Sequence, residues 1–163
     1  MARTRSIKFP NTFTELEPLL DKIQRPLSSF LLNTAALAIG TAKAKVLIAN
    51  TIYAYIEGAL VTKASAEIVL SGTVVADLFN VYVLSMNAAG TVTASMGTAG
   101  ATLAGVVFPT LADGSVMIGF VIVNPTGTGN FVGGTTELDD ATVVPNAVYI
   151  NTPVPFLPGM ATL

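Results

Sequence analysis

Apolar residues recur at every second position over much of the chain from residue 44 onward. The clearest case is residues 52–57, where Ile52, Ala54 and Ile56 alternate with two tyrosines and a glutamate. A period of two is typical of a β-strand, and both faces of this one are fairly apolar. We therefore expect this strand to lie in a sheet that is buried on both sides.

Short apolar and β-branched runs, separated by glycine, proline and asparagine, continue the pattern to residue 151. They predict strands over residues 46–51, 52–57, 59–62, 66–70, 79–86, 91–96, 103–108, 116–123 and 147–151, with a brief pairing at residues 131–132. A hairpin is expected at residues 87–90, a turn at residues 113–114 and a loop over residues 133–144. Strands at intervals of about ten residues favour an antiparallel β-sandwich or barrel.

The N-terminal region has a different pattern. Residues 1–13 are predicted to form an arm, and a capping-box sequence at Thr14 then precedes Leu16, Leu20 and Ile23 at helical spacing. Pro26 is expected to end or kink this helix, and a second helical piece is predicted from residue 27 to about residue 37. We therefore divide the chain into an N-terminal arm and helix (residues 1–43) and a β-domain (residues 44–151).

The C-terminal residues 152–163 contain Pro153, Pro155 and Pro158. Proline cannot donate to a sheet ladder, so this tail is expected to be extended and cannot form a central strand. Helices that precede a β-domain and extended proline tails are both common means of tying subunits together.

The composition limits how this chain can bury its apolar surface. Hydrophobic residues make up 52% of the 163 residues and charged residues only 11%, whereas soluble domains carry about a quarter charged residues. A membrane span does not account for this, because the uncharged stretch from residue 78 to residue 112 is interrupted by asparagine, glycine and proline. Burial of apolar surface in an oligomeric assembly is the better explanation, and no membrane partner is expected.

Charge is unevenly distributed along the chain. All eight basic residues lie between Arg3 and Lys63, together with four acidic ones, while the remainder holds six acidic residues and no basic one. This is either drift in a sequence poor in charge or a sign that two parts face two environments. The net charge of −2 gives no reason to expect nucleic-acid binding. No apolar run follows the basic N-terminus before Pro10, so no signal peptide is expected.

The residue types that most often carry catalysis are missing. The chain has no histidine and no cysteine, which excludes the Ser–His–Asp and Cys–His arrangements and thiolate metal sites. Glu137, Asp139 and Asp140 form the densest acidic cluster; a solvated loop tip is the simplest interpretation, ahead of a calcium site or a catalytic carboxylate pair. We therefore expect no enzyme activity, no metal and no cofactor.

Other residues have both a structural and a functional interpretation. The glycines of residues 127–134 lack a nearby lysine and do not precede a helix, so an ordinary surface loop is favoured over a phosphate site. Four tyrosines could stack on carbohydrate, but each lies in a predicted strand, which favours core or subunit packing: Tyr53, Tyr55, Tyr82 and Tyr149. Three methionines are expected to fill the core: Met86, Met96 and Met117.

Three segments resemble small structural proteins of tailed bacteriophages, namely the capsid decoration (cement) and head-fibre proteins: ANTIYAYIEGALV, FNVYVLSMNAAGTVTASMGTAGATLAGVVFP and VMIGFVIVNPTGTGNFVGGTTELDD. The resemblance spans about residues 45–151. It lies in composition, which is rich in Ala, Gly, Thr and Val, low in charge and free of Cys, and in short stretches of sequence rather than in a diagnostic motif. It implies a β-sandwich or jelly-roll-like domain, often trimeric, with an N-terminal region that fixes the protein to the particle. It implies no catalytic residue.

These observations lead to a first hypothesis and to alternatives. The first is a homo-oligomer, with a trimer favoured, on the outer surface of a virion, bound to the major capsid protein or another virion protein. Its attachment residues would lie in the N-terminal region: Arg3, Arg5, Lys8, Leu16, Leu20 and Ile23. The alternatives are a tail-fibre or receptor-binding module that contacts host glycans through residues 126–136, a small glycan hydrolase, and a host adhesin or pilin-like subunit.

Overall fold

A computed structural model describes residues 29–125, 128–145 and 147–152. These residues form twelve β-strands and one short 3-10 helix, and every strand pairing is antiparallel. The elements are β1 (Phe30–Leu31), β2 (Leu37–Ile39), β3 (Lys45–Ile48), β4 (Ile52–Ile56), β5 (Ala59–Lys63), β6 (Ala66–Val69), β7 (Thr73–Val74), β8 (Asn80–Asn87), β9 (Val92–Met96), η1 (Leu103–Gly105), β10 (Ser115–Val123), β11 (Phe131–Val132) and β12 (Val148–Asn151). The expectation of a mainly β, antiparallel protein is confirmed.

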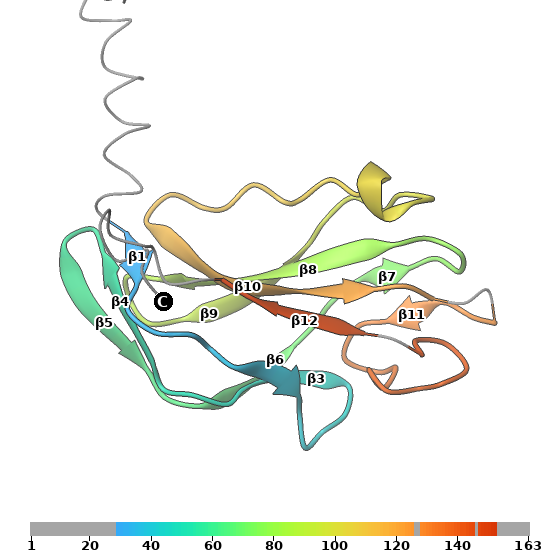
Figure 1. Ribbon diagram of the computed structural model, residues 1–163, viewed down its shortest axis with the longest axis horizontal. Helices are drawn as coiled ribbons and strands as arrows, with labels where there is room; N and C mark the ends of the chain where they lie inside the picture. Colours follow the sequence, from blue (N-terminus) through green and yellow to red (C-terminus); the bar gives the residue numbers. More distant parts are fainter. Residues whose placement is uncertain (1–28, 126–127, 146, 153–163) are drawn as a thin grey trace, which may run out of the picture.

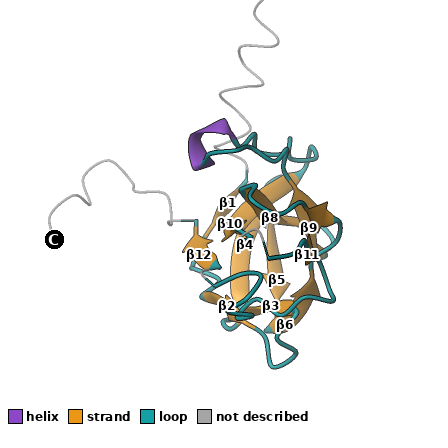
Figure 2. Ribbon diagram, turned by 90° about the vertical axis from the view of Figure 1, so that its right-hand side faces the viewer, coloured by secondary structure: helices purple, strands orange, loops and turns teal. Residues whose placement is uncertain are grey.

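The strands form four sheets, with the orders β12-β10-β8-β9, β1-β4-β5, β2-β3-β6 and β11-β7. The longest pair, β8 and β10, crosses the molecule, while β4, β5 and β3 lie on the other side of the core (Figure 1). Figure 2, viewed at 90° to Figure 1, shows the strands arranged around a common interior.

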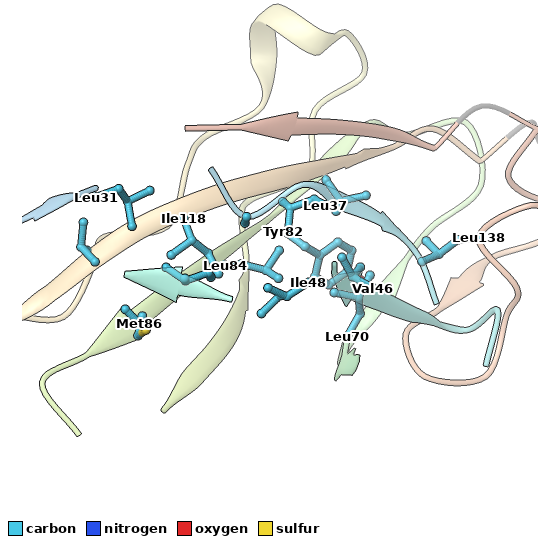
Figure 3. Packing of buried hydrophobic residues seen from close by; sticks show 14 of the residues in the cluster. Leu31, Leu37, Val46, Ile48, Leu70, Tyr82, Leu84, Met86, Ile118 and Leu138 are labelled. Atoms are coloured by element: carbon cyan, nitrogen blue, oxygen red, sulfur yellow. The ribbon is translucent and has the colours of Figure 1, made fainter. Parts of the chain in front are cut away.

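One hydrophobic core connects these sheets. From β8, the side chains of Tyr82, Leu84 and Met86 point into it, and Val46 and Ile48 of β3 approach from the opposite side (Figure 3). Alternate residues of β3, β4 and β8 supply the core, as the period of two predicts. Each fully buried leucine or isoleucine contributes about 1.5–3 kcal/mol relative to an exposed one, so this shared core is the main force that holds the sheets together.

Strand β8 is buried on both of its faces, because residues 97–108 cross over the side that points away from the core (Figure 1). Val81 and Val83 lie on that outer side and are almost completely covered. Two antiparallel bridges hold the crossing segment, one between Phe79 and Gly100 and one between Thr98 and Val107. Residues 97–108 are therefore an ordered cover of the sheet.

The prediction of a strand over residues 103–108 is wrong. Leu103–Gly105 is a 3-10 helix, and the chain folds back on itself around it. A Cβ on Gly100 would lie 2.5 Å from the carbonyl carbon of Gly105, so the two limbs of this loop meet at a distance that only glycine permits. The close return overrides the β-propensity of the leucine and valine residues within it.

The prediction of a second helical piece over residues 27–37 is also wrong for the described residues. Phe30 and Leu31 pair with β4, and β2 begins at Leu37. Asn33 fixes the connection between them, because its side-chain amide donates to the Thr51 carbonyl oxygen at 2.7 Å and its side-chain oxygen accepts from the Tyr53 amide at 2.8 Å. Within the described residues, the sheets therefore begin at Phe30 and not at residue 44.

Two further predictions are confirmed, and two concern residues that the structure does not describe. The hairpin at residues 87–90 is confirmed, with the Gly90 amide donating to the Asn87 carbonyl at 2.9 Å and Gly90 at a φ of 72°. The brief pairing of residues 131–132 is confirmed as β11 against β7. The arm and helix predicted before residue 29, and the tail after Thr152, lie outside the described residues.

Candidate interaction surface

The outward side of β4 is open, contrary to the expectation that its sheet is buried on both sides. Ile52, Ala54 and Ile56 point into the core, while Tyr53 and Tyr55 are 45% and 39% exposed. The alternation of the sequence thus separates a core side from an aromatic side. In the isolated chain the aromatic side faces solvent.

Neighbouring strands extend this aromatic surface. Phe30 of β1 and Leu60 of β5 lie on either side of Tyr55 in the strand register, and the Leu32 amide donates to the Tyr53 carbonyl at 2.9 Å. The rings of Phe30 and Tyr55 are parallel, with centroids 5.7 Å apart and planes at 10°. We call the surface formed by Phe30, Leu32, Tyr53, Tyr55 and Leu60 the aromatic face.

The aromatic face contains no charged side chain, and Leu60 at 59% is its most exposed member. Its position at β1 places it next to Ser29, where residues 1–28 join the described domain. Contiguous exposed apolar patches of several hundred Å² mark interaction sites on soluble proteins. The arrangement is suited to contact with another apolar protein surface.

A second exposed apolar surface lies on the outer side of β12 and β10. Phe108 packs edge-on against Phe120 of β10, with ring centroids 5.0 Å apart, and Phe120 pairs with Ile150 of β12. Leu103, Val107, Val148 and Ile150 are all exposed, Val107 to 60%. We call the surface formed by Phe108, Val148 and Ile150 the loop face. This surface was not predicted from the sequence, because residues 103–108 were expected to form a strand rather than a returning loop.

The four tyrosines do not form one patch. Tyr82 is fully buried and meets Phe131 edge-on, with ring centroids 5.9 Å apart. Burial raises the pKa of Tyr82 to about 12, and burial followed by the charge of Asp139 raises the pKa of Tyr149 to about 12. The hydroxyls of both are buried without a hydrogen-bond partner. Packing is thus the role of Tyr82 and Tyr149, while Tyr53 and Tyr55 remain available for contact.

Of the three methionines, only Met86 fills the core as expected. Its side chain is fully buried in the cluster shown in Figure 3. Met96 is exposed, and Met117 is half-buried on the outward side of β10. The core-filler prediction therefore holds for one of the three.

The acidic cluster tethers its own loop. Asp139 pairs with Lys43 at 2.8 Å, and Asp140 accepts from the amides of Thr142 and Val143 at 2.8 Å and 3.2 Å. The hydrogen bond and charge of Asp139 raise the pKa of Lys43. Within the described ranges, no three acidic side chains come together as a group that could hold a metal ion.

The glycine-rich loop is also explained by packing. A Cβ on Gly133 would lie 2.8 Å from backbone atoms of Leu70 and Ser71, and the Gly133 amide donates to the Gly72 carbonyl at 2.9 Å. Asn130 accepts from the Ala76 amide at 3.0 Å. In its described part, this loop uses glycine to lie close to the β6–β7 connection.

The attachment residues proposed from sequence all lie outside the described residues: Arg3, Arg5, Lys8, Leu16, Leu20 and Ile23. No helix among the residues that the structure describes has the length and apolar character of a membrane span. No family model, curated protein or solved structure matches this chain.

Proposed function

We propose that this chain is a structural protein of a tailed-bacteriophage virion that decorates and stabilises the outer surface of the capsid as a homo-oligomer, with a trimer favoured. The observation that carries the proposal is the aromatic face, an uncharged surface of large side chains next to the point where residues 1–28 join the domain. In this proposal the aromatic face contacts other copies of the chain, and residues 1–28 contact the major capsid protein or another virion protein.

The fold agrees with this role. Strands β8 and β10 lie on one side of the core, and β3, β4 and β5 lie on the other (Figure 1). We take these two layers as a jelly-roll-like β-sandwich that is preceded by an N-terminal arm and helix. A closed oligomer would cover the aromatic face and limit its aggregation. The alternating basic residues Arg3, Arg5 and Lys8 would meet an acidic capsid surface, and Leu16, Leu20 and Ile23 would supply the apolar contact.

Stabilisation follows from mass action. A protein that binds the assembled shell and not the opened one shifts the equilibrium toward the assembled shell. This role needs interface area and no chemical step. The carboxylates placed by the structure are consistent with it, since Asp139 and Asp140 hold a loop and Glu67 accepts the amides of Thr41 and Ala42 at 2.6 Å and 3.2 Å. We therefore propose a non-catalytic protein without a cofactor.

Co-sedimentation with particles stripped of the protein tests this function. The full chain should bind the particles, whereas a chain lacking residues 1–28 should fold and fail to bind. Two full-length variants divide the attachment further, one with Arg3, Arg5 and Lys8 changed to alanine and one with Leu16, Leu20 and Ile23 changed to serine. If the truncated chain decorates particles normally, residues 1–28 do not attach it. If the full chain does not bind, the decoration role is wrong.

A second candidate function is a fibre-tip module that binds host glycans. It is favoured by one observation, the exposed Tyr53 beside the parallel Phe30–Tyr55 pair, because flat aromatic platforms can stack on the apolar faces of sugar rings. A glycan array separates the two functions. Binding that is lost in a Tyr53→Ala, Tyr55→Ala double variant would support the fibre-tip role, and an array without signal would support decoration.

A further inference from the structure

The turn between β2 and β3, which we call the hairpin tip (residues 40–45), is held by a carboxylate from another strand. Glu67 of β6 accepts the amides of Thr41 and Ala42 at 2.6 Å and 3.2 Å. The tip folds closely around this side chain, since a Cβ on Gly40 would lie 3.0 Å from Oε1 of Glu67. Because hydrogen bonds to an ionised carboxylate are stronger than those to a neutral acceptor, the charge of Glu67 fixes the course of the tip.

The same tip fastens the loop that carries the acidic cluster, which we call the acidic loop (residues 137–144). The Leu138 amide donates to the carbonyl oxygen of Lys43 at 2.9 Å, and Nζ of Lys43 pairs with Asp139 at 2.8 Å. Leu138 is 2% exposed and lies at one end of the core cluster (Figure 3). Lys43 therefore connects the hairpin tip, through both its backbone and its side chain, to a loop that inserts a leucine into the core.

The charged side chains at this end of the domain differ in their relation to Glu67. Lys45 faces it directly, with Nζ 3.7 Å from Oε2. The others lie on the tip or in the acidic loop: Lys43, Glu137, Asp139 and Asp140. Glu67 is thus the carboxylate that acts on the tip itself, while Asp139 acts on the contact between the tip and the loop.

The surroundings of Glu67 favour its ionised form. The hydrogen bond from the Ala42 amide is the largest cause that lowers the pKa of this carboxyl below the usual 4.5, and the Thr41 amide and the charge of Lys45 lower it further. A group whose pKa is lowered on folding stabilises the fold above its unfolded pKa, and this stabilisation is lost as pH falls through the folded value. Acidic pH is therefore the condition that weakens the hold on the tip.

We propose that Glu67 controls an acid-sensitive latch: while Glu67 is ionised, the hairpin tip holds the acidic loop against the core, and protonation of Glu67 releases the tip and the loop together. The sheets can stay closed, because β6 pairs with β3 through its backbone and not through this carboxyl group. Release would uncover Leu138, so this end of the domain would present an apolar surface at acidic pH. The inference is independent of the proposed function.

Amide hydrogen exchange of the full chain at neutral pH tests the coupling. In Glu67→Gln, which keeps the size of the side chain and removes its charge, the protection of the Thr41 and Leu138 amides should fall at least about fivefold, because local opening becomes easier. Asp77→Asn, which removes a charge from the connection between β7 and β8, is the matched control and should leave both amides unchanged. A Leu138 amide that keeps its wild-type protection in Glu67→Gln overturns the proposal.

Exchange measured from about pH 7 down to about pH 3 identifies the titrating group. In the wild type the protection of Leu138, corrected for the intrinsic exchange rate at each pH, should fall as Glu67 takes up its proton, while the Val83 amide of β8 stays protected. Glu67→Gln should abolish this pH dependence, and Asp139→Asn should retain it. The proposal is overturned by a pH dependence that persists in Glu67→Gln or is lost in Asp139→Asn, and equally by Val83 losing protection together with Leu138.

Discussion

Phe30 and Tyr55 stack across β1 and β4 with nearly parallel rings, 5.7 Å between centroids. Aromatic pairs contribute about 0.5–1.5 kcal/mol beyond the area that they bury. The stack attaches the first strand of the described domain to the outer side of β4. It also holds the aromatic face in a fixed arrangement, which reduces the ordering cost of a contact there.

Placing a charge on this face should disrupt the proposed self-association. We expect Leu60→Asp to weaken the oligomer at least about tenfold, because the interface would have to bury an unpaired carboxylate. The fold should persist, since Leu60 is 59% exposed. Light scattering over a concentration series measures the effect. Val69→Asp, at a similarly exposed position on β6, is the matched control and should remain oligomeric. A wild-type chain that is monomeric at all concentrations would contradict the interface.

The buried hydroxyl of Tyr82 provides a stability prediction. It has no hydrogen-bond partner although the side chain is fully buried. An unsatisfied buried polar group costs about 1–3 kcal/mol, so Tyr82→Phe should raise the free energy of unfolding by about 1 kcal/mol in denaturant titrations. Tyr53→Phe, on the exposed side of β4, should have no measurable effect. A loss of stability in Tyr82→Phe would show that the hydroxyl has a partner.

The same burial predicts a fall in stability at alkaline pH. The pKa of Tyr82 and of Tyr149 is raised from the usual 10.0 to about 12. Between these values the unfolded chain has released protons that the folded chain still holds, so the stabilisation present below pH 10 is lost as pH rises toward 12. Unfolding midpoints measured across this window should fall less steeply in a Tyr82→Phe, Tyr149→Phe double variant. Equal slopes would contradict the assignment.

The sequence predicted the long strands of the β-domain better than it predicted the start of the domain and the loop that crosses β8. Strands β4, β8 and β10 carry strong alternation or dense β-branched residues, and local pattern decides such elements. The short β1 was missed, because two residues have no period and Asn33 acts through contacts with Thr51 and Tyr53 that lie far along the chain. Tertiary contact also set the course of residues 97–108, where Gly100 meets Gly105.

The candidate surface was predicted only in part. The sequence indicated that Tyr53 and Tyr55 share one side of a strand, and it favoured packing over sugar binding for them. It could not place Phe30 and Leu60 beside them, because strand register depends on the fold as a whole. For the same reason the loop face, where Phe108 lies near β12 through its contact with Phe120, had no signal in the sequence.

Two neighbouring residues in the loop of residues 133–144 should differ in their importance for stability. Leu138 is 2% exposed and packs in the core (Figure 3), whereas Asp139 forms a half-exposed ion pair with Lys43. We expect Leu138→Ala to cost about 2–4 kcal/mol. Asp139→Asn should have only a small effect, because exposed ion pairs are screened by solvent. Denaturant titrations of both variants test this contrast, and a larger loss for Asp139→Asn would reverse the interpretation of the loop.

At Gly97, where the crossing loop of residues 97–108 begins, there is no room for even one methyl group. A Cβ on Gly97 would lie 2.5 Å from the Val107 carbonyl oxygen and 2.9 Å from Cγ2 of Val81. Neither neighbour can move freely, because Val107 is bridged to Thr98 and Val81 is buried in β8. Gly97→Ala should therefore lower the free energy of unfolding by about 1–3 kcal/mol.

The same substitution should act locally as well as globally. It should separate residues 97–108 from the sheet and increase amide exchange at Thr98 and Val107, which pair with each other. Gly129→Ala is the matched control, since its nearest neighbour would lie 3.7 Å away, and it should retain wild-type stability. If Gly97→Ala unfolds at the wild-type midpoint with unchanged exchange in this loop, residues 97–108 do not pack on β8 as described. If only the loop becomes unprotected while the midpoint holds, the loop covers the sheet without contributing to its stability.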